Sequence, residues 1–256
     1  MVKRRNRGVN KITSRRLIFA ALIAVFTIGG AVAIYNLLAT EANYTAARQE
    51  YADLRQFAPA APDPPPAEII ADSESDESEE PARSSHDMPD LTPINPDYIG
   101  WIRIEGTDVD YPVVQGANNT RYVNITFMGE RNPSGAIFMD SRSIGGFEGL
   151  SILHGHNMRD GSMFAALHSY LEDGFLDEHP DILIFAPDGK ILVFRIFDVK
   201  MTNIRDFAYT LPDRDREDVD EFFFGYGIRT GADVLILSTC ADSHRNDRLL
   251  IFAARS

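Results

Sequence analysis

Cys240 is the only cysteine in the 256-residue chain, and it ends an apolar run that begins at Val234. A single thiol cannot form an intramolecular disulfide and supplies at most one ligand to a metal, so nucleophilic catalysis is a candidate role. The alternative is structural, because free cysteine is among the most buried residue types and often packs as a small hydrophobe. The residues around Cys240 therefore decide between the two roles.

Arg248 opens a second apolar run eight positions after Cys240. Only the short loop 241–247 separates the two runs, so they can pair as antiparallel strands and bring the guanidinium close to the thiol. A fixed cation in that place favours the thiolate or stabilises a developing oxyanion. The competing interpretation is a surface arginine that pairs with Asp242 or Asp247.

A thiol nucleophile also needs a proton-transfer partner, most often a histidine. His154 and His156 stand where the apolar run 150–153 gives way to a loop, a position typical of catalytic groups. His244, in the loop after the cysteine, is a rival. Because residues i and i+2 of a strand point to the same side, His154 and His156 could instead chelate a metal in a hydrolase. Asp160 is only a weak third ligand for such a site, so the sequence predicts no metal and no cofactor.

The N-terminal region has the pattern of a membrane anchor. Residues 1–16 contain seven Lys and Arg and no acid, and residues 17–39 contain no charged residue. The second stretch is long enough to cross a ~30 Å hydrocarbon core as a helix, and the basic side stays in the cytoplasm. We therefore expect a single-pass membrane protein with a cytoplasmic N-terminus and an extracellular domain; a signal peptide cleaved at residues 31–33 is the alternative. The net charge of −13 argues against nucleic acid as a partner.

Residues 40–90 are expected to link the anchor to the folded domain. Residues 41–57 can form a short amphipathic helix. The side chains on one face of that helix are Tyr44, Ala47, Tyr51 and Leu54. Residues 58–96 are rich in Pro, Ser and acidic residues and hold too few apolar side chains to offset the entropy of ordering, so a disordered stalk is expected.

The last segment, residues 91–256, is predicted to be one mostly β domain. Short apolar or alternating runs recur in it between turn signals. The expected strands are 98–104, 111–114, 136–139, 150–154, 182–185, 191–199 and the two runs that flank the loop 241–247. Two segments, 163–170 and 213–226, have helical patterns. Strands joined by short loops favour a closed barrel with additional short helices over a doubly wound sheet.

Taken together, these residues resemble a sortase. The segments that carry the resemblance are Leu237-Ser238-Thr239-Cys240, with Arg248 after it, and Gly155-His156-Asn157 upstream. Three further segments are similar to class B sortases: NPDYIGWI at 95–102, YPVVQ at 111–115 and GAIFMD at 135–140. The resemblance covers the whole predicted domain, about residues 91–256.

The resemblance implies an eight-stranded sortase β-barrel and a cysteine transpeptidase of Gram-positive bacteria. Cys240 would attack the threonine carbonyl of a C-terminal sorting signal and form a thioacyl-enzyme. His156 would act as general acid and then as base, and Arg248 would orient the substrate and stabilise the oxyanion. The secreted protein would then pass to a peptidoglycan precursor or to a pilin amine. His154 would be a packed or hydrogen-bonded neighbour of His156.

The resemblance also implies a peptide groove. Asn119, Val123 and Ser238 would line it, and the helix expected at 213–226 would form one wall. One departure is visible, because relatives often carry an acid directly after the cysteine, where this chain has Ala241. The catalytic domain is expected to be monomeric. The alternative function is a non-catalytic, membrane-tethered extracellular binding barrel.

Overall fold

The computed structural model describes residues 7–60, 90–241 and 246–255. The chain forms two compact units, the first ending at Ala46 and the second starting at Ala47. Most of the predicted stalk lies outside the described residues, as do Asp242 and His244.

The first unit is helical. Helix α1 (Arg7–Leu54) exposes large apolar side chains along the predicted span, among them Phe19, Phe26 and Leu37. It is long and apolar enough to cross a membrane, which is compatible with the predicted anchor. Residues 41–57, which were expected to form a short amphipathic helix, are helical: they form the last part of α1, without a break after the anchor, and then η1 (Arg55–Phe57). No Gly or Pro interrupts the chain there, and Thr40 Oγ donates to Asn36 O within the same helix.

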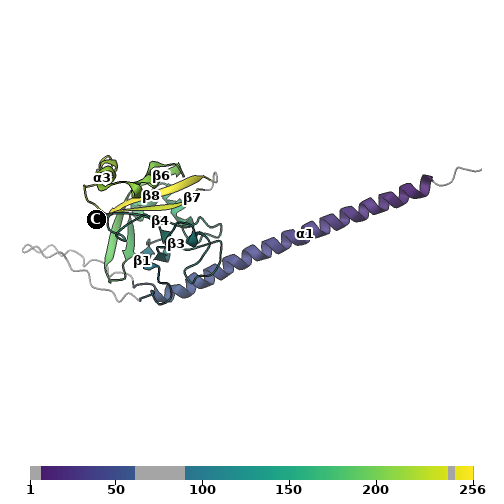
Figure 1. Ribbon diagram of the computed structural model, residues 1–256, viewed down its shortest axis with the longest axis horizontal. Helices are drawn as coiled ribbons and strands as arrows, with labels where there is room; N and C mark the ends of the chain where they lie inside the picture. The colour runs from purple at the N-terminus through teal and green to yellow at the C-terminus, as the bar shows by residue number, and fades with distance from the viewer. Residues whose placement is uncertain (1–6, 61–89, 242–245, 256) are drawn as a thin grey trace, which may run out of the picture. The chain divides into compact units, whose positions relative to one another are not determined.

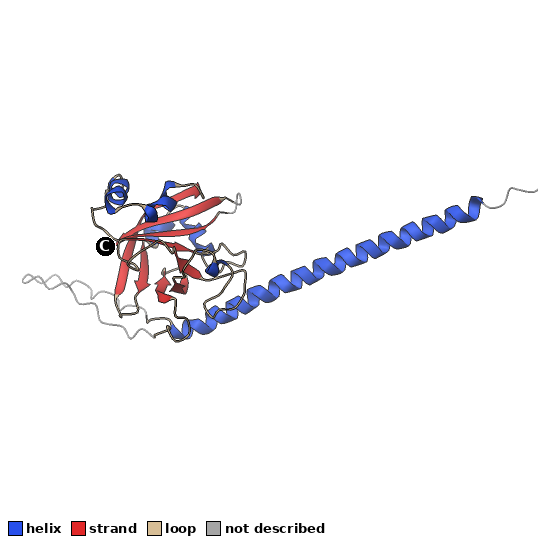
Figure 2. Cartoon of the chain, in the orientation of Figure 1, coloured by secondary structure: helices blue, strands red, loops and turns tan. Residues whose placement is uncertain are grey.

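The second unit is an eight-stranded closed barrel, which confirms the predicted fold class. Its strands are β1 (Tyr98–Arg103), β2 (Asp110–Val114), β3 (Ile137–Met139), β4 (Leu150–His154), β5 (Asp181–Phe185), β6 (Ile191–Asn203), β7 (Val234–Cys240) and β8 (Asp247–Arg255). They are hydrogen-bonded in the order β1-β2-β3-β4-β7-β8-β6-β5, which closes on itself. The strands make up the body of this unit, and its other elements are short helices and the last residues of α1 (Figures 1 and 2).

The described short helices lie between the strands and at the end of α1. They are η1 (Arg55–Phe57), η2 (Arg121–Val123), η3 (Ala165–Leu171), α2 (Phe175–Glu178), η4 (Phe207–Asp213) and α3 (Arg216–Phe224). The helix predicted from residue 163 begins two residues later, because Met163 has a left-handed φ of 58° that no helix accepts. Val219 and Phe223 of α3 pack on Ile236 and Phe252 of the sheet, together with Leu211 of η4. This packing holds η4 against β4, β7 and β8.

Two strand pairings determine where the candidate site forms. β4 and β7 are parallel, with His154 paired to Ser238, so their carboxyl ends meet at the same edge of the barrel. β7 and β8 are antiparallel, with Cys240 paired to Arg248. The end of β4, the end of β7 and the start of β8 therefore lie side by side.

The end of α1 belongs to the barrel unit. Ala47, Tyr51 and Leu54 are each no more than 4% exposed, which confirms that these predicted positions form a buried apolar face. The compact unit thus extends upstream of residue 91, where the folded domain was expected to begin.

Candidate active site

All six predicted site residues line one pocket of about 570 Å³ at the meeting point of β4, β7 and β8. They are Asn119, Val123, His156, Ser238, Cys240 and Arg248. Residues of η4 and of the segment before it complete the lining, among them Ile204, Tyr209 and Thr210. α3 supplies none of the described residues around this pocket, so the expectation that the helix at 213–226 walls the groove is wrong. α3 instead packs through Val219 and Phe223 on the buried apolar residues of η4, β7 and β8.

Cys240 is half-buried and lines the pocket. The six residues before it in β7 are buried, which fixes the strand while leaving its last side chain accessible. Ser238 O also accepts a hydrogen bond from Gly155 N at 3.1 Å, so the Cys240 strand is joined directly to the His156 loop. The thiol is therefore not the fully buried packing group of the structural alternative.

Arg248 is held beside Cys240 by the register of the paired strands β7 and β8. Its Nη1 donates to the backbone oxygen of Asp247 at 2.8 Å. Its guanidinium lines the pocket, where a planar fork of donors can meet a carbonyl oxygen or an oxyanion.

His156 lies just beyond the end of β4, with its Nε2 2.8 Å from Val123 O. A carbonyl oxygen can only accept, so Nε2 carries a proton in this arrangement. Val123 therefore orients the imidazole through its backbone. Gly155 is required before His156, because a Cβ at that position would lie 2.5 Å from the ring of Phe164 and 2.6 Å from Ile137.

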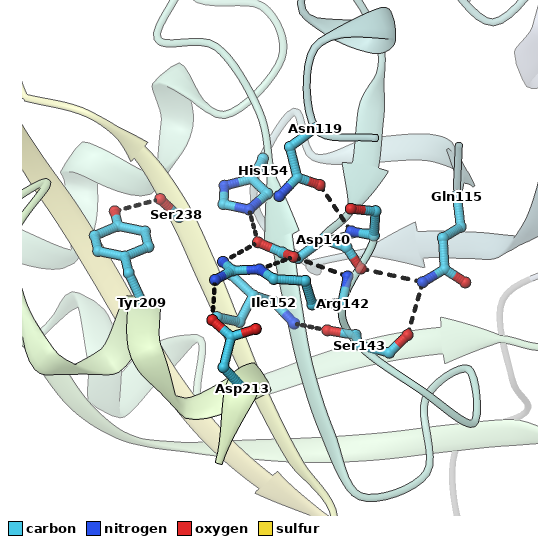
Figure 3. A network of polar contacts seen from close by, with 11 residues as sticks. Gln115, Asn119, Asp140, Arg142, Ser143, Ile152, His154, Tyr209, Asp213 and Ser238 are labelled. Carbon is cyan, nitrogen blue, oxygen red and sulfur yellow. Dashed lines mark hydrogen bonds and ion pairs between the residues drawn. The ribbon is translucent and has the colours of Figure 1, made fainter. Parts of the chain in front are cut away.

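A buried carboxylate, Asp140, organises one side of the pocket (Figure 3). Its side chain is 1% exposed and accepts two hydrogen bonds of 2.9 Å from Arg142. His154 Nε2 lies 3.1 Å away from it. Burial alone would raise the pKa of Asp140, but hydrogen bonds from Arg142, His154 and Asn119 outweigh burial and hold that pKa well below its usual value. His154 is thus the hydrogen-bonded neighbour that the sequence predicted, and its partner is Asp140.

The same network reaches the opposite side of the pocket through η4. Arg142 Nη1 donates to Asp213 at 2.7 Å, and Tyr209 Oη lies 2.8 Å from Ser238 Oγ (Figure 3). Burial raises the pKa of Tyr209, so its hydroxyl keeps its proton at neutral pH. These contacts fix η4 across the pocket from Asp140.

The two histidines of the His-x-His pair have different partners. His154 bonds to the Asp140 carboxylate and His156 to a backbone carbonyl. Across the part of the chain that the structure describes, no group of three or more His, Cys, Asp or Glu side chains is close enough to hold a metal ion. The geometry therefore gives no support to a metallohydrolase.

Comparison with known proteins identifies the family. A family model described as the sortase domain matches residues 102–256, more than half of the chain. The chain belongs to the sortase family. Sortases are cysteine transpeptidases.

The relatives place this sortase in class B. Sortase B of Staphylococcus aureus is 30% identical over 165 residues, which span 60% of this chain and 67% of the relative. Sortase B of Listeria monocytogenes is 41% identical over 95 residues, but the match spans only 37% of this chain and 39% of the relative. The crystal structure of Clostridium perfringens sortase B has a TM-score of 0.58 and 30% identity, and the match covers 65% of this chain and 97% of that one.

Several pocket residues of this sortase were not predicted as site residues, among them Asp140, Arg142 and Tyr209. Asp140 ends one of the class B-like segments, so an acid directly after an apolar strand was the available signal. Arg142 and Tyr209 stand in segments without a recognisable pattern, and only the fold brings them to the pocket.

Proposed function

We propose that this class B sortase cleaves a C-terminal sorting signal of secreted proteins at a Thr-X bond and transfers the protein to an amine of the cell wall or of a pilin. The observation that carries the proposal is one pocket lined by Cys240, His156 and Arg248. A nucleophile, an acid–base group and a fixed cation are the three functions that acyl transfer through a thioester needs.

In the first half-reaction the Cys240 thiolate attacks the threonine carbonyl carbon of the bound peptide. The oxygen becomes an oxyanion, which the Arg248 guanidinium stabilises. His156 gives a proton to the leaving nitrogen, the C–N bond breaks, and the acyl group remains on sulfur as a thioester. The released product carries a new amino terminus.

In the second half-reaction an acceptor amine attacks the thioester carbon. His156, now neutral, takes a proton from the attacking nitrogen, and the C–S bond breaks to restore the thiolate. The new amide joins the secreted protein to a peptidoglycan precursor or a pilin amine.

A peptide is the best-supported occupant of the pocket. The solved Staphylococcus aureus sortase B–substrate complex is 29% identical and has a TM-score of 0.58, covering 65% of this chain and 82% of that one. By analogy, Asn119, Val123 and Ser238 would contact the sorting signal along the groove. The barrel would act as a monomer on the extracellular side of the membrane, with residues 17–39 as a single-pass anchor and residues 1–16 in the cytoplasm. The catalytic domain would be the barrel unit that begins at Ala47.

The test uses the full chain in membrane vesicles or detergent, with a library of Thr-containing sorting peptides and mass spectrometry of the intact protein. We expect a thioester adduct on the wild-type chain, released by an added amine, and none on Cys240→Ala. A peptide that binds both chains equally and forms no adduct would instead indicate the non-catalytic binding barrel.

A further inference from the structure

The last turns of α1 contact the segment that orients His156. Tyr51 is 4% exposed, and its hydroxyl donates to Gly135 O at 2.6 Å. One residue earlier on the helix, Glu50 Oε1 accepts a hydrogen bond from Met128 N at 3.0 Å. Both acceptor and donor belong to the stretch between η2 and β3, so α1 binds this stretch at two points.

Gly135 in turn packs directly on Val123, whose carbonyl holds His156. A Cβ on Gly135 would lie 2.3 Å from Tyr122 O and 2.7 Å from Val123 O, so the two backbone segments are in close contact. The Tyr51 hydroxyl is therefore connected to the His156 imidazole through two backbone segments and two hydrogen bonds.

A second contact from α1 reaches the loop that follows His156. Arg48 stands one turn before Tyr51, and its Nε lies 2.8 Å from Asp160 Oδ2. The Asp160 side chain is only 4% exposed, and its other oxygen accepts hydrogen bonds from the backbone and the hydroxyl of Ser162. This loop returns to the histidine, because Phe164 N donates to His156 O at 2.9 Å.

The loop is conformationally strained and also rests on a partner of Tyr51. Met163 is the one non-glycine residue with a positive φ in the described part of the chain. Its backbone N–H donates to the hydroxyl of Tyr111 at 2.9 Å, and the Tyr111 ring packs edge-on against Tyr51 at 5.3 Å between centroids. A strained backbone persists only where its surroundings hold it.

We propose that Tyr51 and Arg48 are positioning residues for His156, which the end of α1 holds from both sides. Tyr51 fixes the carbonyl that Nε2 bonds, and Arg48 fixes the loop that carries the imidazole. The anchor helix thus contributes to the acid–base step as well as to tethering. The proposal rests on the proposed role of His156.

The test compares matched variants in the full chain. Tyr51→Phe removes one buried hydroxyl that donates to a backbone carbonyl, and Tyr170→Phe removes an equivalent hydroxyl that donates to His179 O at 2.8 Å, outside the pocket lining. Arg48→Met removes the ion pair with Asp160. Its matched control is Arg195→Met, which removes the ion pair between Arg195 on β6 and Asp181 on β5. The readouts are kcat and KM for adduct release, Tm, and the NMR signal of the His156 Nε2 proton.

We expect Tyr51→Phe to lower kcat about tenfold with little change in KM, because a small misplacement of a catalytic group is enough for such a loss. Arg48→Met should lower kcat less, and in both variants the His156 proton should exchange faster with water. Each control, Tyr170→Phe or Arg195→Met, should change Tm about as much as its matched variant does. Both controls should leave kcat and the His156 proton signal unaltered.

Equal loss of kcat in Tyr51→Phe and Tyr170→Phe, with an unchanged His156 signal in both, would overturn the proposal. Absence of any adduct on the wild-type chain would overturn the proposed function instead. In that case the NMR comparison still decides whether α1 positions the imidazole.

Discussion

Cys240 and Arg248 are register partners in the antiparallel pair of β7 and β8. Their proximity is therefore set by the backbone ladder, and both side chains line the same pocket. The sheet itself therefore holds the thiol and the guanidinium next to each other.

Two substitutions of Arg248 distinguish the effect of its positive charge from the effect of its planar shape. Arg248→Lys keeps a cation but loses the planar fork, so we expect kcat to fall about 10²-fold while the alkylation rate of Cys240 stays close to that of the wild type. Arg248→Met should lower both. Peptide cleavage and timed iodoacetamide labelling measure the two effects. A Lys variant with full activity would show that charge alone is sufficient.

The two neighbouring histidines should differ sharply in their effects. His156→Ala removes the group that contacts Val123 O in the pocket, and we expect kcat to fall by roughly 10²- to 10⁴-fold. His154→Ala removes a hydrogen bond to Asp140, so it should lower Tm and raise KM while leaving most of kcat. Steady-state kinetics with one peptide distinguishes them, and the reverse pattern would move the catalytic role to His154.

The Asp140 network predicts how stability depends on pH. The pKa of the Asp140 carboxyl is lower in the folded chain than in the unfolded chain, where it is ~3.9. Asp140 therefore stabilises the fold at pH values above ~3.9, and this stabilisation is lost as the pH falls from there toward the pKa of the folded state. Asp140→Asn should therefore lower the free energy of unfolding by about 2 kcal/mol at pH 7. This loss is smaller than for a fully buried ion pair, because the partner Arg142 is 36% exposed and solvent screens the interaction. The stability of Asp140→Asn should also fall less steeply than that of the wild type below about pH 4.

Urea unfolding at a series of pH values measures this effect. Asp188→Asn is the matched control, because Asp188 forms an exposed pair with Lys190. Parallel pH curves for the wild type and Asp140→Asn would contradict the assignment.

The Arg142–Asp213 contact predicts an effect on peptide binding. Asp213 is 61% exposed and ends η4, so Asp213→Ala should cost little stability and loosen the pocket wall that carries Tyr209. We expect KM for the peptide to rise a few-fold with kcat unchanged. Asp181→Ala, which breaks the comparable surface pair with Arg195, should leave KM as it is. An unchanged KM in both variants would show that the contact does not shape the pocket.

The packing of the α1 end predicts where the chain can be shortened. A chain starting at residue 47 should keep the Tm of the full chain, because the barrel unit begins there. A chain starting at residue 90 loses Ala47, Tyr51 and Leu54, of which the two large side chains contribute about 1.5–3 kcal/mol each. Its Tm should fall by about 10 °C or more. Equal Tm values for the two shortened chains, measured by calorimetry, would contradict this.

Local patterns were sufficient to predict most of the barrel. Runs of apolar residues bounded by turn signals predict the strands to within a few residues. They do so because a buried strand needs apolar side chains within its own sequence. The pairing of Cys240 with Arg248 was also predictable, because a short loop leaves the two strands one simple arrangement.

The remaining features depend on contacts between distant segments. The parallel pairing of β4 with β7, which places the His156 loop beside Cys240, has no local signal in either strand. Asp140 and Tyr209 reach the pocket only after the barrel has closed. The sequence also predicted the apolar face of the α1 end correctly but gave no indication that this face packs on the barrel.

The parallel pairing of β4 and β7 has a consequence for the time at which the pocket forms. β5, β6, η4 and α3 all lie between these two strands in the chain, and β8 follows them. A chain still emerging from the ribosome has therefore made His156 long before Cys240 and Arg248. The three groups become neighbours only when the last two strands enter the sheet. Completion of the barrel is therefore also the step that assembles the proposed catalytic pocket.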